Sequence, residues 1–228
     1  MKNKCTLEQS DVATFLALNH KNDRNDAVKF LFRMLTSFII TKLKGRGFVF
    51  TSQYYNMTDL RLAISPEQGC FAYQTARIIS AKRIVEFGTS FGISTVYLAS
   101  AIKDNGGGIV IGSEFVNEKV NIARENLTKL KLLKYTDIRA GDARETLSDP
   151  GGSVDMVLLD GSKDLYLDII RTLKPYLCQG AVVLADNVTS PFIKRTLSSY
   201  VRYMQDRKNG FISMTLPFKD GLEFSIKV

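Results

Sequence analysis

Three oxygen-bearing side chains follow two apolar segments of the chain and could together hold a divalent cation. Asp160 ends the apolar segment that begins at Val154. Asp186 ends the one that begins at Gly180, with Asn187 directly after it. In a parallel sheet the carboxyl ends of the strands meet at one edge, so we expect these side chains to converge there. Carboxylate and amide oxygens are hard ligands, which suit Mg²⁺ or Ca²⁺ and not zinc. Each aspartate alone could instead cap the helix that follows it, so the metal site is predicted from the set of three.

A second group, residues 83–94, predicts a strand, a tight glycine turn and the start of a helix. Gly88 and Gly92 are spaced G-x-x-x-G, and Ser90 stands where a dinucleotide-binding turn has its second glycine. Glu86 would face any phosphate bound there with a negative charge. The turn therefore favours a ligand without phosphate and with positive charge, for which S-adenosyl-L-methionine is suitable. Turns of this kind also occur for packing reasons alone.

Two more acidic residues follow the next predicted strands. Glu114 closes the strand that begins at Gly108, at the position where an α/β nucleotide site binds ribose hydroxyls. Asp142 ends the strand predicted over residues 136–142 and could accept a hydrogen bond from an adenine amino group. A solvated carboxylate is the alternative interpretation of both residues.

Composition limits the classes of protein that remain. The chain has 228 residues, of which 45% are hydrophobic and 24% charged, enough for one α/β domain with a full core. Cys5, Cys70 and Cys178 are far apart and odd in number, which argues against a disulfide framework or a cysteine zinc site and is consistent with a reducing cytoplasm. His20 is the only histidine, so a histidine metal site and a Ser-His-Asp triad are excluded by count.

The charge and the apolar segments predict few partners beyond a small molecule. The net charge of +8 is scattered and shows no basic–aromatic interleaving, so we do not expect a nucleic-acid partner. The first residues lack the apolar core of a signal peptide. The longest apolar stretch, around residues 34–40, is too short to span a bilayer. The expected location is therefore cytoplasmic, without membrane attachment.

The chain divides into two predicted parts. Residues 1–62 are expected to be a helical cap, with an amphipathic helix over residues 26–43 that stops at Gly45. We expect this cap to shape the acceptor pocket or a dimer contact and to be dispensable for the core fold. Residues 63–228 alternate strand and helix, which predicts a Rossmann-like, doubly wound, mostly parallel sheet. Two strands joined by residues 218–221, with an Asp-Gly turn signal, predict an antiparallel hairpin at the end.

Four motifs carry a resemblance to a known family. They are Glu86-Phe-Gly-Thr-Ser-Phe-Gly92, Asp160-Gly-Ser-Lys-Asp-Leu-Tyr166, Ala185-Asp-Asn187 and Asp220-Gly-Leu-Glu223. Together they resemble the cation-dependent O-methyltransferases, the group of catechol and caffeoyl-CoA O-methyltransferase, from about Ser65 to the C-terminus. The resemblance implies a seven-stranded sheet whose last strand is antiparallel, and a small hydroxylated, catechol-like acceptor. A homodimer is a further expectation.

The resemblance also implies roles for individual residues. Asp160, Asp186 and Asn187 match the metal ligands, with Mg²⁺ the expected ion, and Lys163 matches the lysine that takes the substrate proton. Contacts to S-adenosyl-L-methionine are expected at Glu86, Gly88, Ser90, Gly92, Ser94, Glu114, Phe115, Asp142, Ala143 and Asp160. Gly161 and Ser162 replace the bulkier pair of catechol O-methyltransferase, and residues 188–191 lack an acidic side chain. These departures leave the acceptor undetermined.

Two other functions remain open on the sequence alone. One is a metal-independent methyltransferase of a nucleic-acid base or protein nitrogen, whose activity would survive EDTA. The other is a non-catalytic S-adenosylmethionine-binding module, which would bind cofactor without metal. An NAD-dependent oxidoreductase is disfavoured by the glycine spacing and the terminal hairpin.

Overall fold

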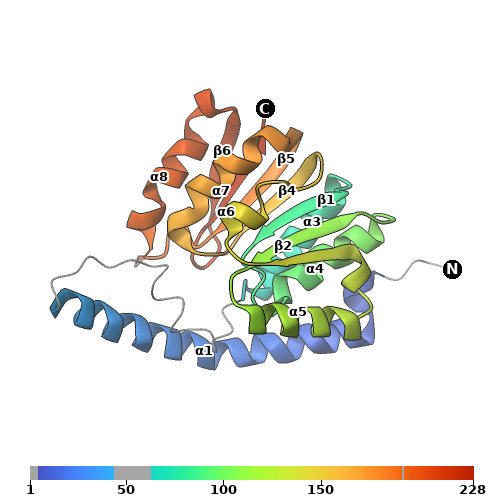
Figure 1. Cartoon of the computed structure of the whole chain (residues 1–228), viewed down its shortest axis with the longest axis horizontal. Helices are drawn as coiled ribbons and strands as arrows, with labels where there is room; N and C mark the ends of the chain where they lie inside the picture. Colours follow the sequence, from blue (N-terminus) through green and yellow to red (C-terminus); the bar gives the residue numbers. More distant parts are fainter. Residues whose placement is uncertain (1–4, 44–62, 192) are drawn as a thin grey trace.

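The computed structural model describes residues 5–43, 63–191 and 193–228. Within them lies a seven-stranded sheet of order β3-β2-β1-β4-β5-β7-β6 (Figure 1). Its strands are β1 (Arg83–Phe87), β2 (Ile109–Glu114), β3 (Thr136–Ala140), β4 (Val154–Leu159), β5 (Leu177–Asp186), β6 (Phe211–Leu216) and β7 (Leu222–Lys227).

Strand direction agrees with the sequence prediction. Strands β1 to β5 are parallel, whereas β7 runs antiparallel to both β5 and β6. The central strands β1 and β4 are buried along nearly their whole length, on both faces. Such burial is expected for parallel strands covered by helices on each side. The mostly parallel sheet with a C-terminal antiparallel hairpin is therefore confirmed.

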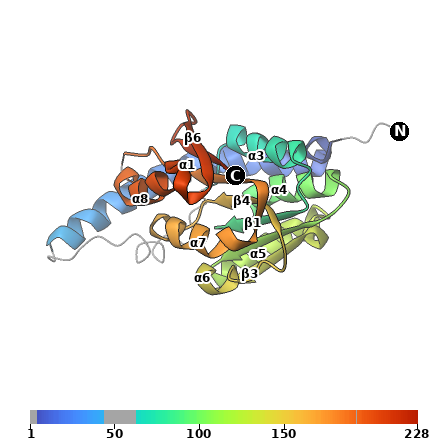
Figure 2. The same ribbon diagram turned by 90° about the horizontal axis from the view of Figure 1, so that it is seen from above.

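Helices cover the two faces of the sheet. They are α1 (Ser10–Leu43), α3 (Pro66–Ile78), α4 (Ile93–Asp104), α5 (Asn117–Lys129), α6 (Ala143–Thr146), α7 (Tyr166–Leu173) and α8 (Lys194–Gln205). One buried cluster contains side chains from α1, α3, α4 and α5, and the other contains side chains from α6, α7 and α8. Figure 2 shows α3 and α4 on one side of β1 and β4, with α6 and α7 on the other.

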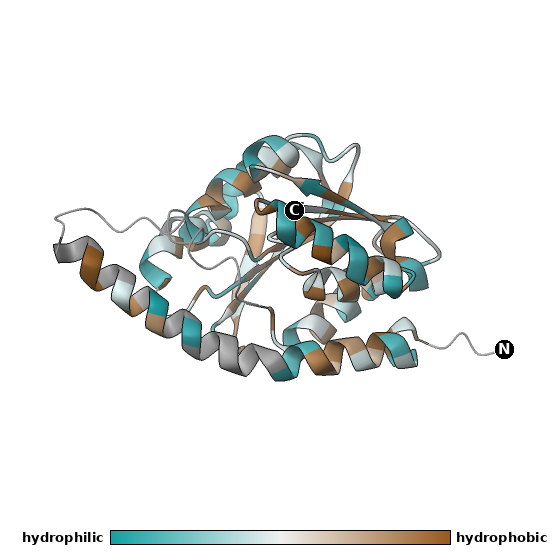
Figure 3. Ribbon diagram, turned by 60° about the horizontal axis from the view of Figure 1, so that its bottom comes forward, coloured by the Kyte–Doolittle hydropathy of each residue, from teal (hydrophilic) through white to brown (hydrophobic). Residues whose placement is uncertain are grey.

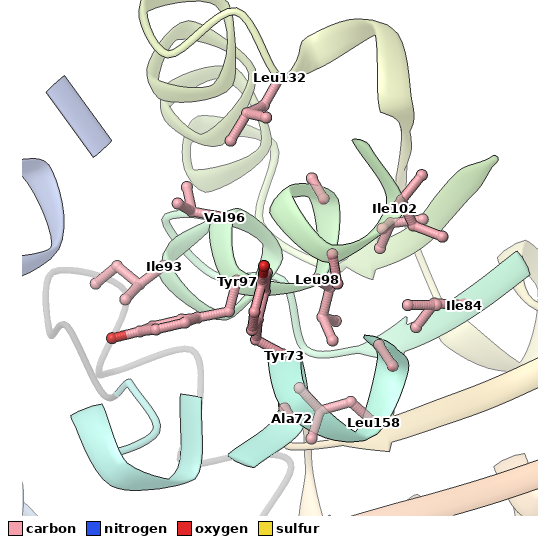
Figure 4. Packing of buried hydrophobic residues seen from close by; sticks show 14 of the residues in the cluster. Ala72, Tyr73, Ile84, Ile93, Val96, Tyr97, Leu98, Ile102, Leu132 and Leu158 are labelled. Atoms are coloured by element: carbon pink, nitrogen blue, oxygen red, sulfur yellow. The ribbon is translucent and has the colours of Figure 1, made fainter. Parts of the chain in front are cut away.

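Helix α3 begins with a capping box, in which the first residue before the helix and the third residue inside it bond to each other's backbone. Ser65 Oγ accepts from the Gln68 backbone N–H, and Gln68 Oε1 accepts from the Ser65 backbone N–H. Pro66 occupies the first turn, where its missing N–H costs nothing. Farther along α3, an added Cβ at Gly69 would lie 2.4 Å from the Tyr97 ring of α4. Figure 4 shows Tyr97 and Tyr73 in the packing between these two helices. The missing side chain of Gly69 thus lets α3 pack close against α4.

Helix α1 begins earlier than the sequence predicts, at Ser10 instead of near residue 26. In the early turns, Val12 and Leu16 are buried in the core cluster shared with α3 and α4. The Thr6 backbone N–H donates to Asp104 of α4, and His20 is hydrogen-bonded to the Tyr97 hydroxyl. A narrow buried stripe and these tertiary contacts stabilise a helix whose mean apolarity is low. The first half of α1 therefore contributes Val12 and Leu16 to the core cluster, and the dispensability of residues 1–62 stays a prediction.

The second half of α1 differs from the first. Phe32, Leu35, Ile39 and Ile40 are exposed, and Figure 3 shows apolar residues recurring along this helix. The expected helix stop at Gly45 lies outside the described residues. In the part of the chain that the structure describes, no helix combines the length and apolarity needed to cross a membrane.

Candidate active site

The glycine turn after β1 requires unusual backbone conformations. Gly88, Ser90 and Gly92 have φ values of 99°, 48° and 84°, in the left-handed region that favours glycine. A Cβ added at Gly88 would lie 2.6 Å from the Gly161 backbone nitrogen, so β1 and the segment after β4 meet here backbone to backbone. Packing is therefore sufficient to explain a glycine at position 88, which is the alternative interpretation of the turn. The same packing brings the turn beside Asp160.

Glu86 lies buried beneath this turn. Its Oε2 accepts hydrogen bonds from the hydroxyls of Thr89 (2.9 Å) and Thr95 (2.6 Å). Its Oε1 is buried and has no hydrogen-bond partner among the described residues. Burial raises the pKa of this carboxyl because the charged form loses hydration. An incoming cationic N–H donor would both satisfy Oε1 and stabilise the charge, so the site fits a ligand with an ammonium group.

A small hollow, open to solvent, lies at the turn. It is lined by Ala63, Gly88, Thr89, Ser90, Phe91, Ile93, Ser94 and Asp160. Four predicted cofactor contacts, Gly88, Ser90, Ser94 and Asp160, are thus brought together around one space.

Glu114 is not a solvated strand-end carboxylate, because its exposed fraction is only 2%. Its two oxygens accept from the backbone N–H groups of Ser90 (2.8 Å) and Val116 (3.0 Å). It therefore holds the left-handed Ser90 in place, a role that the sequence did not reveal. Each carboxylate oxygen can accept a second hydrogen bond, so ribose hydroxyls remain compatible with this arrangement. Phe115 follows with an exposed fraction of 47% and offers an apolar surface beside it.

Asp142 has a local partner. Its side chain caps α6 by accepting from the Arg144 backbone N–H (2.9 Å), and it forms an ion pair with the Arg144 guanidinium (2.5 Å). The hydrogen bond from Arg144 lowers the pKa of this carboxyl. Ala143 is the first residue of the capped helix. The structure thus gives Asp142 a helix-capping function and leaves its predicted adenine contact as a proposal.

Two buried carboxylates end adjacent strands. Asp186 is the last residue of β5, and Asp160 follows β4, whose last residue Leu159 pairs with Ala185. Burial, reinforced by the nearby Asp160 charge, raises the pKa of Asp186 to about 7. Burial also raises the pKa of Asp160. Neighbouring carboxylates that repel each other in a buried site are stabilised by a bound cation.

Neither aspartate caps a helix, which was the alternative interpretation of each. The helices that follow them have no side-chain capping bond. Asp160 Oδ1 instead accepts from Lys163 Nζ (2.8 Å), and Asp186 Oδ1 accepts from the Gln68 amide. The carboxylates are thus oriented by side chains that meet at this edge of the sheet.

Lys163 is almost fully buried and held from two sides. Its ammonium donates to Asp160 Oδ1 and to the Tyr166 hydroxyl (2.7 Å), and that hydroxyl lies 3.4 Å from the Asp186 carbonyl oxygen. Gly161 allows this packing, because an added Cβ there would lie 2.6 Å from the Phe87 ring. The predicted base and both predicted metal-binding carboxylates therefore form one cluster. The sequence motif contained Tyr166 but did not indicate its partner.

Asn187 completes the predicted ligand set. It adopts a left-handed φ of 68°, a conformation in which asparagine is enriched among non-glycine residues. Among the described residues no group of three His, Cys, Asp or Glu side chains could hold a metal ion. A cation at Asp160 and Asp186 would therefore need the Asn187 amide oxygen, and two carboxylates with one amide suit a hard divalent ion. The donor set fits Mg²⁺ in type and charge.

The sheet order, the reversed β7 and the glycine turn beside a carboxylate cluster together define a Rossmann-like methyltransferase fold. An O-methyltransferase from Bacillus cereus, solved in complex with S-adenosylhomocysteine, has this fold: it is 18% identical, with a TM-score of 0.67 over 85% of this chain and 97% of that one. Residues 85–188 match a family model described as a methyltransferase domain.

Curated relatives give a more specific resemblance. The chain is 33% identical over 129 residues to a catechol O-methyltransferase of Mycobacterium tuberculosis and 30% identical over 131 residues to one of Niastella koreensis. Each match covers 56% of this chain and 58% of the relative, so the chain spans little more than half the length of these relatives. The expected resemblance to the catechol O-methyltransferase group is confirmed over that region.

Proposed function

We propose that the protein is an S-adenosyl-L-methionine-dependent and divalent-cation-dependent O-methyltransferase that acts on a small acceptor with neighbouring hydroxyl groups. The observation that supports it most is the position of Asp160. This residue lines the hollow of the glycine turn and also belongs to the cluster with Lys163 and Asp186. A methyl donor in the hollow and a hydroxyl at the cluster would therefore be neighbours. The catechol O-methyltransferase relatives support the acceptor class.

The cofactor would be held by charge and by backbone shape. Glu86 would pair with its ammonium group, Ser94 lines the hollow beside it, and Glu114 would accept from ribose hydroxyls while it holds Ser90. Phe115 would lie against the adenine. The close approach of Gly88 to the backbone of Asp160 and Gly161 leaves no room for a side chain at position 88. Each contact is compatible with hydrogen bonds that the protein already makes.

The acceptor would be activated at the cluster. When bound, S-adenosyl-L-methionine supplies an electrophilic methyl group, and a cation held by Asp160, Asp186 and Asn187 acidifies the acceptor hydroxyl as a Lewis acid. Lys163, in its neutral amine form, would take the hydroxyl proton at Nζ and become the ammonium that pairs with Asp160. Asp160 and Tyr166 keep Nζ in place for that transfer. Holding hydroxyl and methyl group in line would supply much of the remaining acceleration.

The test is methyl transfer from S-adenosyl-L-methionine to a panel of catechols, flavonoids and hydroxycinnamoyl thioesters, with Mg²⁺ and with EDTA. We expect turnover with Mg²⁺ on at least one vicinal diol and loss of turnover in EDTA and in Asp186→Asn. Cofactor binding measured by calorimetry should persist in both cases. Full turnover in EDTA would move the protein to the metal-independent methyltransferases. Cofactor binding without Mn²⁺ binding or turnover would indicate a non-catalytic module.

A further inference from the structure

The side-chain amide of Gln68 has only one orientation that satisfies its neighbours. Its oxygen Oε1 accepts from the Ser65 backbone N–H at 2.9 Å, a group that can only donate. The amide nitrogen Nε2 must therefore point away from the helix cap, and it donates to Asp186 Oδ1 at 2.5 Å. Gln68 has an exposed fraction of 7% and Asp186 one of 4%, so water does not compete freely for this bond.

The residue type at position 68 is not explained by the helix cap. A capping box accepts glutamate as readily as glutamine at this position. A negative side chain in the first turn would also interact favourably with the helix dipole. Glutamate, however, would place a third carboxylate against Asp186 and would have no donor for it. The buried aspartate therefore accounts for glutamine in a way that the helix does not.

We infer that Gln68 is a positioning residue for the cation, which orients the Asp186 carboxylate through its amide. The inference rests on the proposed function, because it concerns the same cation. The amide fixes one oxygen of Asp186 without adding charge, so the negative charge of the carboxylate remains available. Asp160 is different, since its partner is the Lys163 ammonium. The lone pairs of Asp186 that do not accept from Gln68 then remain available to bind a cation.

The hydrogen bond also links the cation site to the start of α3. Ser65 and Gln68 hold each other through the capping box, and Ala63, two residues before Ser65, lines the hollow. Removal of a residue that hydrogen-bonds to a metal ligand, without binding the metal itself, typically changes metal affinity about 10- to 100-fold. A comparable change is the expected effect at Gln68.

The experiment compares Mn²⁺ binding by calorimetry in the full-length wild type, Gln68→Met and Ser65→Ala. Both variants lose one arm of the capping box, but only Gln68→Met loses the donor to Asp186. We expect Mn²⁺ to bind about 10- to 100-fold more weakly to Gln68→Met and within about twofold of wild type to Ser65→Ala. Melting temperatures and S-adenosylhomocysteine affinities of the two variants should match each other.

Asp186→Asn separates this inference from the proposed function. If wild type binds Mn²⁺, Asp186→Asn does not, and Gln68→Met binds like wild type, the positioning role is overturned and the proposed cation site stands. Equal weakening in Gln68→Met and Ser65→Ala also overturns it, because the helix cap would then be the cause. Absence of Mn²⁺ binding in the wild type would overturn both proposals together.

Discussion

Lys163 is held at the cluster by hydrogen bonds to Asp160 and Tyr166. If it takes the acceptor proton, Lys163→Ala should lower kcat by about 10²- to 10⁴-fold, the usual range for a general base. A phenolic hydroxyl has a pKa of about 10. More acceptor is therefore ionised without help as the pH rises, and the loss should shrink. Steady-state rates across pH check this, with Lys208→Ala, an exposed lysine far along the chain, as the control. A Lys163→Ala enzyme with wild-type kcat at neutral pH would remove Lys163 from the reaction.

Glu86 provides the cleanest test of the cofactor site. Glu114→Ala would remove a ribose acceptor but would also release Ser90, so its effect could not be assigned. Glu86→Gln keeps the shape and removes the charge that would pair with the cofactor ammonium. Such charged hydrogen bonds contribute about 1.5–3 kcal/mol, so S-adenosylmethionine should bind about 10- to 150-fold more weakly. The matched control is Glu223→Gln, another fully buried glutamate that accepts from Gln205 and Ser213 in the terminal hairpin.

Glu86 also makes the cofactor affinity depend on pH. Burial raises the pKa of its carboxyl, so the group takes up a proton at higher pH than an exposed glutamate does. Since the protonated form cannot pair with an ammonium group, wild-type affinity should fall on acidification, and Glu86→Gln should not show this fall. Calorimetric titrations over a pH series measure both. Parallel pH curves for the two proteins would indicate that Glu86 does not face the cofactor.

At the scale of elements, backbone shape at the glycine turn can be separated from ligand binding. Gly88→Ala introduces a Cβ 2.6 Å from backbone atoms at a φ of 99°. Gly180→Ala has a similar φ of 79° but no atom within 4 Å. Left-handed strain alone costs about 1–2 kcal/mol and forced packing about 1–3 kcal/mol more. In chemical denaturation, Gly180→Ala should therefore lower the free energy of unfolding by about 1–2 kcal/mol and Gly88→Ala by about 2–5 kcal/mol. Equal losses would show that the backbone contact relaxes without cost.

The elements themselves were predictable because their signals are local. The apolar segment of β4, the Asp-Gly turn before β7 and the Ser65 cap of α3 each depend on neighbours within a few residues. Partners far along the chain were not predictable. Gln68 and Asp186 are separated by 118 positions and Ser90 and Glu114 by 24, so only the folded sheet brings them together. The three strand-end aspartates, Asp142, Asp160 and Asp186, look alike in the sequence. In the structure only Asp142 caps a helix through its side chain, and this difference was not predictable.

At the scale of the whole molecule, α1 joins two unlike surfaces. Its first half packs in the core through Val12 and Leu16, and His20 is hydrogen-bonded to Tyr97 of α4. Its second half exposes Phe32, Leu35 and Ile39. The boundary near residue 62 stays a proposal. The proposed role in a pocket wall or a dimer contact concerns the second half of α1, because the first half contributes to the core. Light scattering of the intact protein would detect a dimer.

Leu16 and Leu18 test where the core ends along α1. Leu16 has an exposed fraction of 7% and packs in the cluster with Val12, whereas Leu18 has one of 59%. Truncation of a buried leucine costs about 2–5 kcal/mol because it removes apolar contact and leaves a cavity. A surface substitution usually stays within about 0.5 kcal/mol. Since both variants make the same change in the same helix, helix propensity cancels, and the difference measures tertiary packing. Leu16→Ala should therefore lower the free energy of unfolding by about 2–5 kcal/mol in chemical denaturation, and Leu18→Ala should leave it nearly unchanged. If both variants unfold like the wild type, the first half of α1 is a detachable cap after all, and the core begins at α3.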